Sequence, residues 1–156
     1  MIKRYERLHY ANTGTVELPV YSLINEGVTA FDDDLAPKTE TKQYIADENE
    51  KDEVSGYKPT FAYTAEVDAD DLVSQLLYGV GADQTVGAQV EIVTVDVWTD
   101  ALGVCEARKG TYNIIPSKAG SGDPGGALIM EGTLSQDGAL TKGEWTVATK
   151  AFVADA

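Results

Sequence analysis

The chain has 156 residues and a mass of 16.7 kDa, a size that fits one domain with a single sizeable core. Its 26 acidic and 12 basic residues give a net charge of −14, and such a surface repels phosphate, which disfavours tight binding to nucleic acid. A single cysteine, Cys105, excludes an internal disulfide, and a single histidine, His9, argues against metal sites built from nitrogen and sulfur ligands. We therefore expect one domain over residues 1–156, with no metal and no other cofactor.

Residues 1–14 are predicted to form an N-terminal arm that precedes the first strand. The arm starts with basic residues, but no hydrophobic stretch follows them, so we expect no secretory signal. No apolar run in the chain approaches the length that spans a bilayer. Residues 15–23 then predict a strand, because apolar side chains alternate along them. Pro19 cannot donate a ladder hydrogen bond, which places this strand at a sheet edge or at a bulge.

Charged residues dominate the stretch that follows. A turn signal at residues 25–27 leads to three consecutive acids at 32–34, which we interpret as a solvated turn rather than a calcium site, because consecutive carboxylates of an extended chain alternate in direction. Residues 39–45 are polar but could extend as a strand. Residues 47–53 carry six charges and no apolar side chain, so they cannot contribute to a core. We expect a long, mobile, charged loop that protrudes over residues 47–56.

The next two elements have the clearest patterns in the chain. Residues 60–67 predict a strand with Phe61, Tyr63, Ala65 and Val67 on one face. One short helix is predicted over about residues 69–78. Its expected N-cap is Asp68, with Asp70 and Asp71 at the positive end of the helix dipole. Its apolar stripe is formed by Leu72 with Leu76 and by Val73 with Leu77, and Gly79 and Gly81 are expected to end it.

The remaining sequence predicts further strands. Residues 89–98 are apolar enough to be buried on both faces of a sheet, and residues 104–115 and 127–134 predict two more strands. A glycine-rich loop is expected between these two strands, at residues 117–126. Asp137-Gly138 predicts a turn, and the tail predicts a last strand or hairpin. The fold class is therefore mainly β, a sandwich or barrel of about seven strands with one short flanking α-helix.

No plausible catalytic set is found among the residues. A serine triad needs a histidine base, and His9 lies in the predicted arm. We interpret Cys105 as a small buried hydrophobe, and Trp98 and Trp145 as core residues rather than a sugar platform. The glycine-rich stretch lacks the Gly-Lys-Ser or Gly-Lys-Thr that would cradle a phosphate. We expect a binding or assembly module and not an enzyme.

The order of sequence segments resembles the tail tube (major tail) proteins of phages and phage-like contractile particles of Gram-positive bacteria. Leu-Ile-Asn-Glu-Gly-Val-Thr at residues 23–29 is followed by an acidic turn and by Thr-Lys-Gln-Tyr-Ile at residues 41–45. After the charged loop come residues 54–64 and the helix with its acidic cap. Ile-Pro-Ser at residues 115–117 and Glu-Gly-Thr-Leu at residues 131–134 are similar to the same family.

The resemblance implies hexameric rings that stack into a hollow tube through which DNA passes without specific binding. It maps the family's inter-ring loop onto residues 47–56, with Glu48, Glu50, Lys51, Asp52 and Glu53 as contacts between rings. Arg4 and Arg7 of the arm could also pair with acidic surface on a neighbour. The implied partners are other copies of the chain, the tape measure, tail terminator and baseplate proteins, and a sheath protein if the tail contracts. The implied location is the tail of a virion made in the host cytoplasm.

Several alternatives stay open on the sequence. It does not distinguish a contractile from a non-contractile tail, or a phage from a bacteriocin-like particle, and it does not show which strand face would line the tube. A monomeric β-sandwich that binds carbohydrate or protein is the second hypothesis. A small enzyme working through carboxylates alone is the third.

Overall fold

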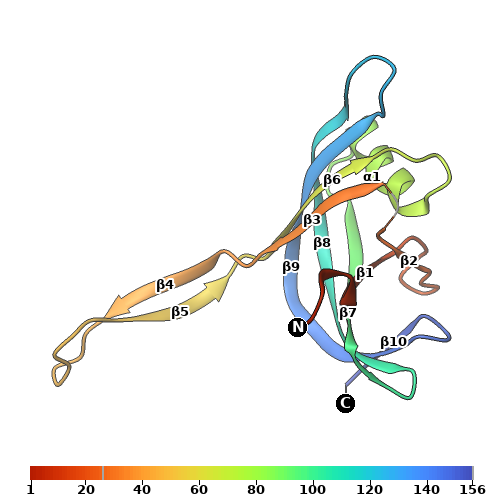
Figure 1. Ribbon diagram of the computed structural model, residues 1–156. Coiled ribbons are helices and arrows are strands. Elements are labelled where there is room, and N and C mark those ends of the chain that lie inside the picture. Colours follow the sequence, from red (N-terminus) through yellow and green to blue (C-terminus); the bar gives the residue numbers. More distant parts are fainter. Residues whose placement is uncertain (26, 156) are drawn as a thin grey trace.

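The computed structural model describes residues 1–25 and 27–155, and within them the chain forms a strongly curled antiparallel sheet, a protruding hairpin and one α-helix (Figure 1). The mainly β fold class is confirmed. In chain order the elements are η1 (Arg4–Glu6), β1 (Arg7–Asn12), β2 (Tyr21–Leu23), β3 (Val28–Asp34), β4 (Pro37–Lys42), β5 (Lys51–Tyr57), β6 (Thr60–Glu66), α1 (Leu72–Ala82), β7 (Gln89–Ala101), β8 (Val104–Ser121), β9 (Ile129–Thr146) and β10 (Ala151–Ala154).

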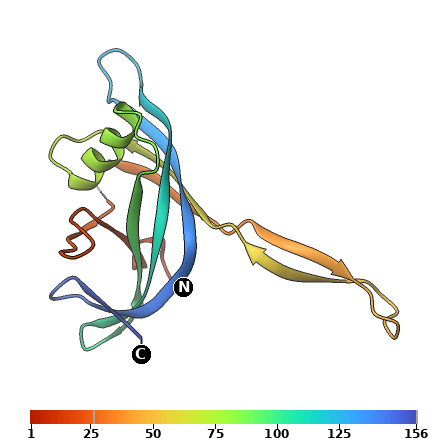
Figure 2. The same ribbon diagram turned by 180° about the vertical axis from the view of Figure 1, so that it is seen from behind.

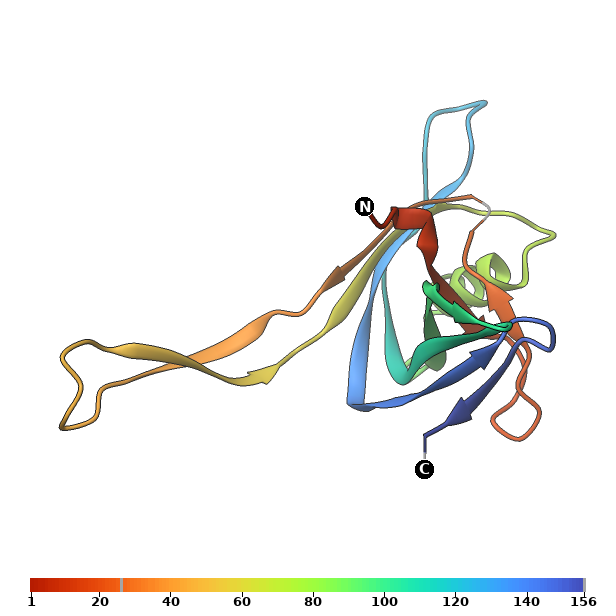
Figure 3. The ribbon, with the colours of Figure 1, turned by 60° about the horizontal axis from the view of Figure 1, so that its bottom comes forward.

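The main sheet has the strand order β2-β1-β7-β8-β9-β6-β3, and β10 pairs with the C-terminal end of β9. The sheet curls into a half-barrel that Figure 3 shows from below. The curl brings β1 towards β3, and side chains rather than a backbone ladder bridge the two. Arg4 Nη2 donates to the Phe31 carbonyl at 3.2 Å, and the rings of His9 and Phe31 lie 4.8 Å apart.

The larger of two cores is enclosed by the curled sheet and α1. The predicted alternation of β6 is confirmed at Phe61, Tyr63 and Ala65, whose side chains are all buried. These side chains pack with residues of the neighbouring strands, among them Ile92, Tyr112 and Leu134, and with Val73, Leu77 and Val80 of α1. The helix thus closes one end of the half-barrel.

The smaller core lies on the opposite face of β7 and β8. It contains Val93 and Val95 together with Cys105, Ala107 and Trp145, so β7 is buried on both faces, as its sequence predicts. The interpretation of Cys105 as a buried hydrophobe is confirmed, and burial raises the pKa of its thiol. Trp145 is also core, stacked 4.5 Å from Tyr10. Trp98 is 43% exposed, so its interpretation as a core residue is wrong.

The structure corrects the prediction for the N-terminal region. Residues 7–12 of the predicted arm form β1, which lies inside the sheet between β2 and β7. The strand predicted over residues 15–23 is reduced to β2, and its exposed apolar residues lie in a loop. Asn12 explains this loop, because its Oδ1 accepts hydrogen bonds from the backbone N–H groups of Gly14 and Val20. Glu26 of the predicted turn lies outside the described residues.

The helix is shifted from its predicted position by three to four residues. Asp71, not Asp68, is the N-cap, and its Oδ1 accepts from the Val73 N–H at 3.0 Å. Gly79 and Gly81 lie inside the helix, which ends at Ala82. A Cβ at Gly81 would lie 3.3 Å from Pro116 Cβ, so this glycine permits close packing on β8 rather than ending the helix. Among the described residues, no helix has the length and apolarity needed to cross a membrane.

Two predictions for the C-terminal half are also corrected. β8 continues to Ser121 and β9 begins at Ile129, so the glycine-rich loop is shorter than predicted. Asp137-Gly138 is not a turn but part of a bulge inside β9, where the ladder shifts between the pairs Lys109–Thr141 and Thr111–Asp137. Gly138 has a φ of 85°, a conformation that glycine adopts without strain and that bulges use.

Candidate assembly surface

The segment predicted as a charged loop is a β-hairpin that extends away from the body of the molecule (Figure 2). β5 pairs with β4 from Lys51 onwards, so the loop is limited to residues 43–50, and the prediction of an irregular loop over residues 47–56 is wrong in its second half. Cross-strand contacts explain why so charged a sequence can pair. Lys42 Nζ lies 3.1 Å from Glu53 Oε2, and Thr41 Oγ1 donates to Asp52 Oδ1 at 2.7 Å.

The hairpin has no core of its own. It continues β3 and β6 beyond the sheet, and the Lys58 N–H donates to the Leu35 carbonyl at its base, at 3.1 Å. All residues of β4 and β5 are exposed except Lys42 and Gly56, which are half-buried. A two-stranded hairpin is marginally stable by itself in water. An element of this kind gains stability when its faces contact another molecule.

The two faces of the hairpin differ in character. Residues directly opposite in an antiparallel pair point to the same side, so the register assigns each pair to one face. One face carries the charged pairs Lys42–Lys51 and Glu40–Glu53. The other face is less charged and consists of Pro37, Thr39, Thr41, Asp52, Val54 and Tyr57. Val54 and Tyr57 are 52% and 61% exposed. This second face is the more suitable one for apolar contact.

The tip of the hairpin, residues 43–50, is ordered by its own hydrogen bonds. The Tyr44 N–H donates to Asp47 Oδ2 at 3.0 Å, and the Asp47 N–H donates back to the Tyr44 carbonyl at 2.9 Å. Lys51 Nζ lies 4.8 Å from the centre of the Tyr44 ring and 3.6 Å from Asp47 Oδ2. Ile45 is left fully exposed at the apex. The tip therefore presents a fully exposed apolar side chain together with acidic groups on an ordered turn.

All five residues predicted as inter-ring contacts lie on this hairpin. Glu48 and Glu50 belong to the tip, and Lys51, Asp52 and Glu53 belong to β5. Lys51 and Glu53 form ion pairs within the hairpin. Within the part of the chain that the structure describes, neither Glu48 nor Glu50 is in an ion pair, so both carboxylates are available to a partner.

The two arginines predicted as arm contacts have intramolecular partners. Arg4 Nη1 donates to the Arg7 carbonyl at 2.8 Å, in addition to its bond to the carbonyl of Phe31. Arg7 Nη2 lies 3.2 Å from Asp33 Oδ2 on β3. The acids at 32–34 are therefore not a solvated turn but the end of β3. Both arginines help to hold β1 against β3 across the gap in the half-barrel.

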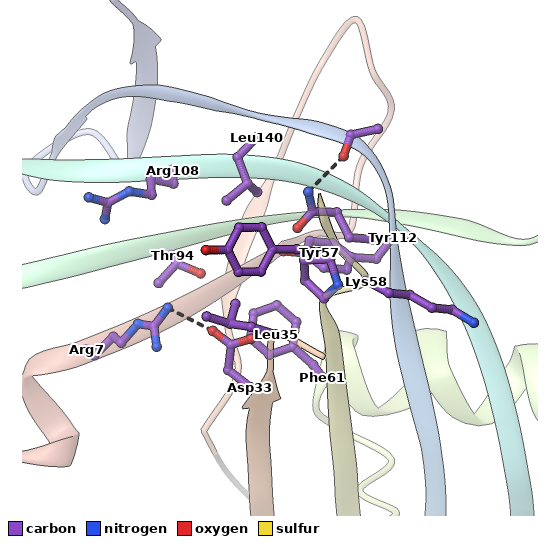
Figure 4. Close-up of a pocket in the computed structure, with 13 residues that line it drawn as sticks. Arg7, Asp33, Leu35, Tyr57, Lys58, Phe61, Thr94, Arg108, Tyr112 and Leu140 are labelled. Carbon is purple, nitrogen blue, oxygen red and sulfur yellow. Dashed lines mark hydrogen bonds and ion pairs between the residues drawn. The ribbon is translucent and has the colours of Figure 1, made fainter. Parts of the chain in front are cut away.

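A cavity of about 570 Å³ opens at the base of the hairpin, at the end of the half-barrel remote from α1 (Figure 4). We call it the mouth. It is lined by Arg7, Asp33, Leu35, Tyr57, Lys58, Pro59, Phe61, Thr94, Arg108, Tyr112, Gln136, Gly138 and Leu140. Burial, and secondarily Asp33, raises the pKa of Tyr112 to about 12, so its hydroxyl stays neutral. Arg108 Nη1 lies 2.9 Å from Asp96 Oδ2, which fixes the guanidinium at the rim.

Sequence reasoning missed the mouth because its residues share no motif. They come from seven strands and the connections between them, and the curl of the sheet brings them together. The sequence does contain one signal, the alternation of side chains between the two faces of each strand. This alternation identifies the residues of the mouth only after the strand order is known.

The outer edges of the sheet are a further feature of the surface. β2 and β3 are the terminal strands of the main sheet, and each pairs on one side only in the described structure. Unpaired strand edges expose backbone donors and acceptors that can pair with another chain. β3 carries three consecutive acids, which discourage unspecific pairing at that edge.

No protein-family model matches the chain, and no curated protein matches it. One solved structure with a similar course of the chain is a component of the anti-feeding prophage (AFP) baseplate, determined by cryo-EM with six-fold symmetry. The two share 10% sequence identity at a TM-score of 0.48, over 90% of this chain and 93% of that chain.

Proposed function

We propose that the chain is a structural, non-enzymatic subunit that stacks as hexameric rings into the hollow tail tube of a phage or phage-like particle. The observation that carries this proposal is the β4–β5 hairpin. It leaves the body, has almost no buried residue, and exposes one weakly charged face and an ordered tip. Such an element contributes little to the stability of its own subunit, and contact with a neighbour explains its presence.

Two further properties support assembly. Closing a ring of subunits would protect the sheet edges at β2 and β3, which an isolated domain leaves open. Six copies would carry six times −14, or −84 charges, so an acidic channel would let DNA pass without adhering. The sequence resemblance adds the expected partners: the tape measure, tail terminator and baseplate proteins, and a sheath protein in a contractile tail.

Replacing the hairpin tests this proposal. Because Leu35 and Lys58 are hydrogen-bonded neighbours, the residues between them can be exchanged for Asn-Gly, a dipeptide suited to a two-residue hairpin turn. We expect the variant to fold, with a cooperative unfolding transition, and to stay monomeric. Concentrated wild-type protein should form rings or tubes in negative-stain electron microscopy. Tubes formed by the variant would contradict the proposal.

A monomeric binding module is the second candidate, and the mouth is the observation that favours it. Its aromatic residues Tyr57, Phe61 and Tyr112 and its arginines could contact a carbohydrate or a peptide. The oligomeric state separates the two candidates. Light scattering at high concentration measures this state, with preformed tail ends added to initiate assembly. A wild-type chain that stays monomeric under these conditions would favour the binding module.

A further inference from the structure

We propose that the mouth of each subunit is the receptor for the hairpin tip of a second copy of the chain. This inference rests on the proposed assembly function and specifies where the hairpin binds. The tip contributes Tyr44 and Ile45 as the apolar part of the contact, and Glu48 and Glu50 as its charged part. The mouth contributes its aromatic and leucine walls and the basic side chains at its rim.

The charges of the two surfaces are complementary. The tip carries three carboxylates and no basic residue. The mouth is lined by Arg7, Lys58 and Arg108. Arg7 is paired with Asp33 and Arg108 with Asp96, whereas Lys58 is in no ion pair within the described residues. The ammonium group of Lys58 is therefore the uncompensated charge at the rim, in a chain whose net charge is −14. An acidic partner is therefore attracted to the mouth and repelled by most of the remaining surface, which selects this docking position.

The apolar parts are also matched. Ile45 is fully exposed at the apex, and Tyr44 beside it is 55% exposed. The mouth offers Leu140, 44% exposed, and Tyr57, 61% exposed, above the buried Phe61 and Tyr112. Its volume of about 570 Å³ lies within the range of cavities that accept bulky groups, roughly 300–1,000 Å³. Insertion of the tip would remove apolar surface from water on both sides.

Both surfaces are ordered before they meet. The tip is held by the reciprocal hydrogen bonds between Tyr44 and Asp47 and by Lys51. The rim is held by the ion pairs Arg7–Asp33 and Arg108–Asp96. A contact between ordered surfaces loses less conformational entropy than one that must order a flexible loop.

The occupant must come from another copy. The hairpin runs outward from Leu35, at the mouth, to Lys42, and seven extended residues cover about 23 Å at roughly 3.3 Å each. The tip therefore cannot fold back into its own mouth. A contact of tip to mouth is heterologous, so each added copy leaves one free tip and one free mouth. Such a contact repeats in one direction, as stacking requires.

A charge introduced into the mouth tests the proposal. Leu140→Glu places a carboxylate where the acidic tip would enter, and Leu128→Glu is the matched control, because Leu128 is 45% exposed near the opposite end of β9. We expect Leu140→Glu to abolish assembly in electron microscopy and light scattering, and Leu128→Glu to assemble as the wild type does. Equal behaviour of the two variants would overturn the docking site. Failure of the wild type itself to assemble would instead count against the proposed function.

A disulfide trap gives an independent reading. The double variant Ile45→Cys, Leu140→Cys should form a ladder of covalent oligomers on a non-reducing gel after mild oxidation. The native Cys105 is buried and does not interfere. Ile45→Cys combined with Leu128→Cys is the control, because a disulfide needs Cα atoms within about 7 Å. Covalent oligomers that form only with the cysteine at position 140 support the contact between tip and mouth. Equal ladders, or no ladder from protein that assembles, would exclude it.

Discussion

His9 shows how a residue that looks catalytic in the sequence serves the core. Its ring packs against the stacked rings of Phe31 and Phe61, with ring centroids 4.8 and 5.1 Å away, and Nδ1 lies 3.0 Å from Thr94 Oγ1. Burial, aided by the positive charges of Arg7 and Arg4, lowers the pKa of His9 to about 3. The imidazole is therefore neutral in the folded protein at every pH near neutrality.

This shift predicts a pH dependence of stability. In the unfolded chain His9 titrates near 6.5, so between pH 6.5 and pH 3 the unfolded state binds a proton that the folded state does not. The free energy of unfolding should fall as the pH falls, by about 2 kcal/mol from this group between pH 7 and pH 5. Urea unfolding at both pH values measures the change. In the His9→Gln variant, the free energy of unfolding should not show this part of the pH dependence. The same pH dependence in both proteins would refute the lowered pKa of His9.

Two glycines give opposite predictions for the same substitution. A Cβ at Gly132 would lie 2.5 Å from Tyr63 Oη and 2.8 Å from the Ile115 carbonyl, so Gly132→Ala should lower the free energy of unfolding by about 1–3 kcal/mol. Gly79 lies inside α1 with no atom near its missing Cβ. Gly79→Ala should raise stability by about 0.5–1 kcal/mol. Thermal unfolding compares the two variants, and changes of the same sign would contradict the packing described.

At the scale of elements, local patterns in the sequence predict some features and fail at others. The alternation in β6 and the apolar run of β7 identify both strands, because each pattern is complete within a few residues. The alternation over residues 15–23 predicts a strand where the structure has a loop after β1. The Asn12 side chain, not hydrophobicity, decides the course of this loop. The sequence predicts a turn at Asp137-Gly138, whereas the structure has a bulge. A turn and a bulge both use a glycine with positive φ, and only the partner strand distinguishes them.

The helix offers a test of its corrected orientation. The sequence suggests two apolar pairs, but only Val73 and Leu77 are buried, whereas Leu72 is 60% exposed. Leu77→Ala should lower the free energy of unfolding by about 2–5 kcal/mol through loss of buried surface and the cavity left behind. Leu72→Ala should change it by less than about 0.5 kcal/mol. Chemical denaturation of both variants decides whether the face of α1 that carries Val73 and Leu77 packs on the sheet.

Hydrogen exchange tests the hairpin as an element. In dilute monomer the amides of β4 and β5 should exchange much faster than those of β6, because the hairpin has no core and opens locally. On assembly they should become protected. Exchange measured by mass spectrometry on monomer and assembled protein gives both values. Protection that stays the same in the two states would show that the hairpin does not become buried between subunits.

At the scale of the whole molecule, the net charge of −14 was evident in the sequence, but its distribution was not. The rim of the mouth depends on the curl that brings Arg7 and Arg108, each with its acidic partner, to one opening, where Lys58 is the unpaired cation among the described residues. Composition does not show this arrangement, because the charged residues come from segments that are far apart in the sequence.

The overall charge predicts weak contact with DNA. Electrostatic binding to phosphates is strongest at low salt, so a gel-shift experiment with double-stranded DNA at about 20 mM salt is the most sensitive test. We expect no retention of DNA by the monomer or by the assembled protein. A basic protein of similar mass should retain DNA under the same conditions. Salt-sensitive binding by this chain would contradict an acidic channel that DNA slides through.

The attachment of the hairpin has a mechanical consequence. β4 and β5 continue the lines of β3 and β6, and β6 pairs with β9 along its whole length. A pull on the tip therefore acts along β6 and loads the hydrogen bonds of this ladder together, rather than peeling them apart one by one. Tension applied at the apex would pass through β6 into β9, one of the two longest strands of the sheet, and the hairpin would behave as a tether anchored in that ladder.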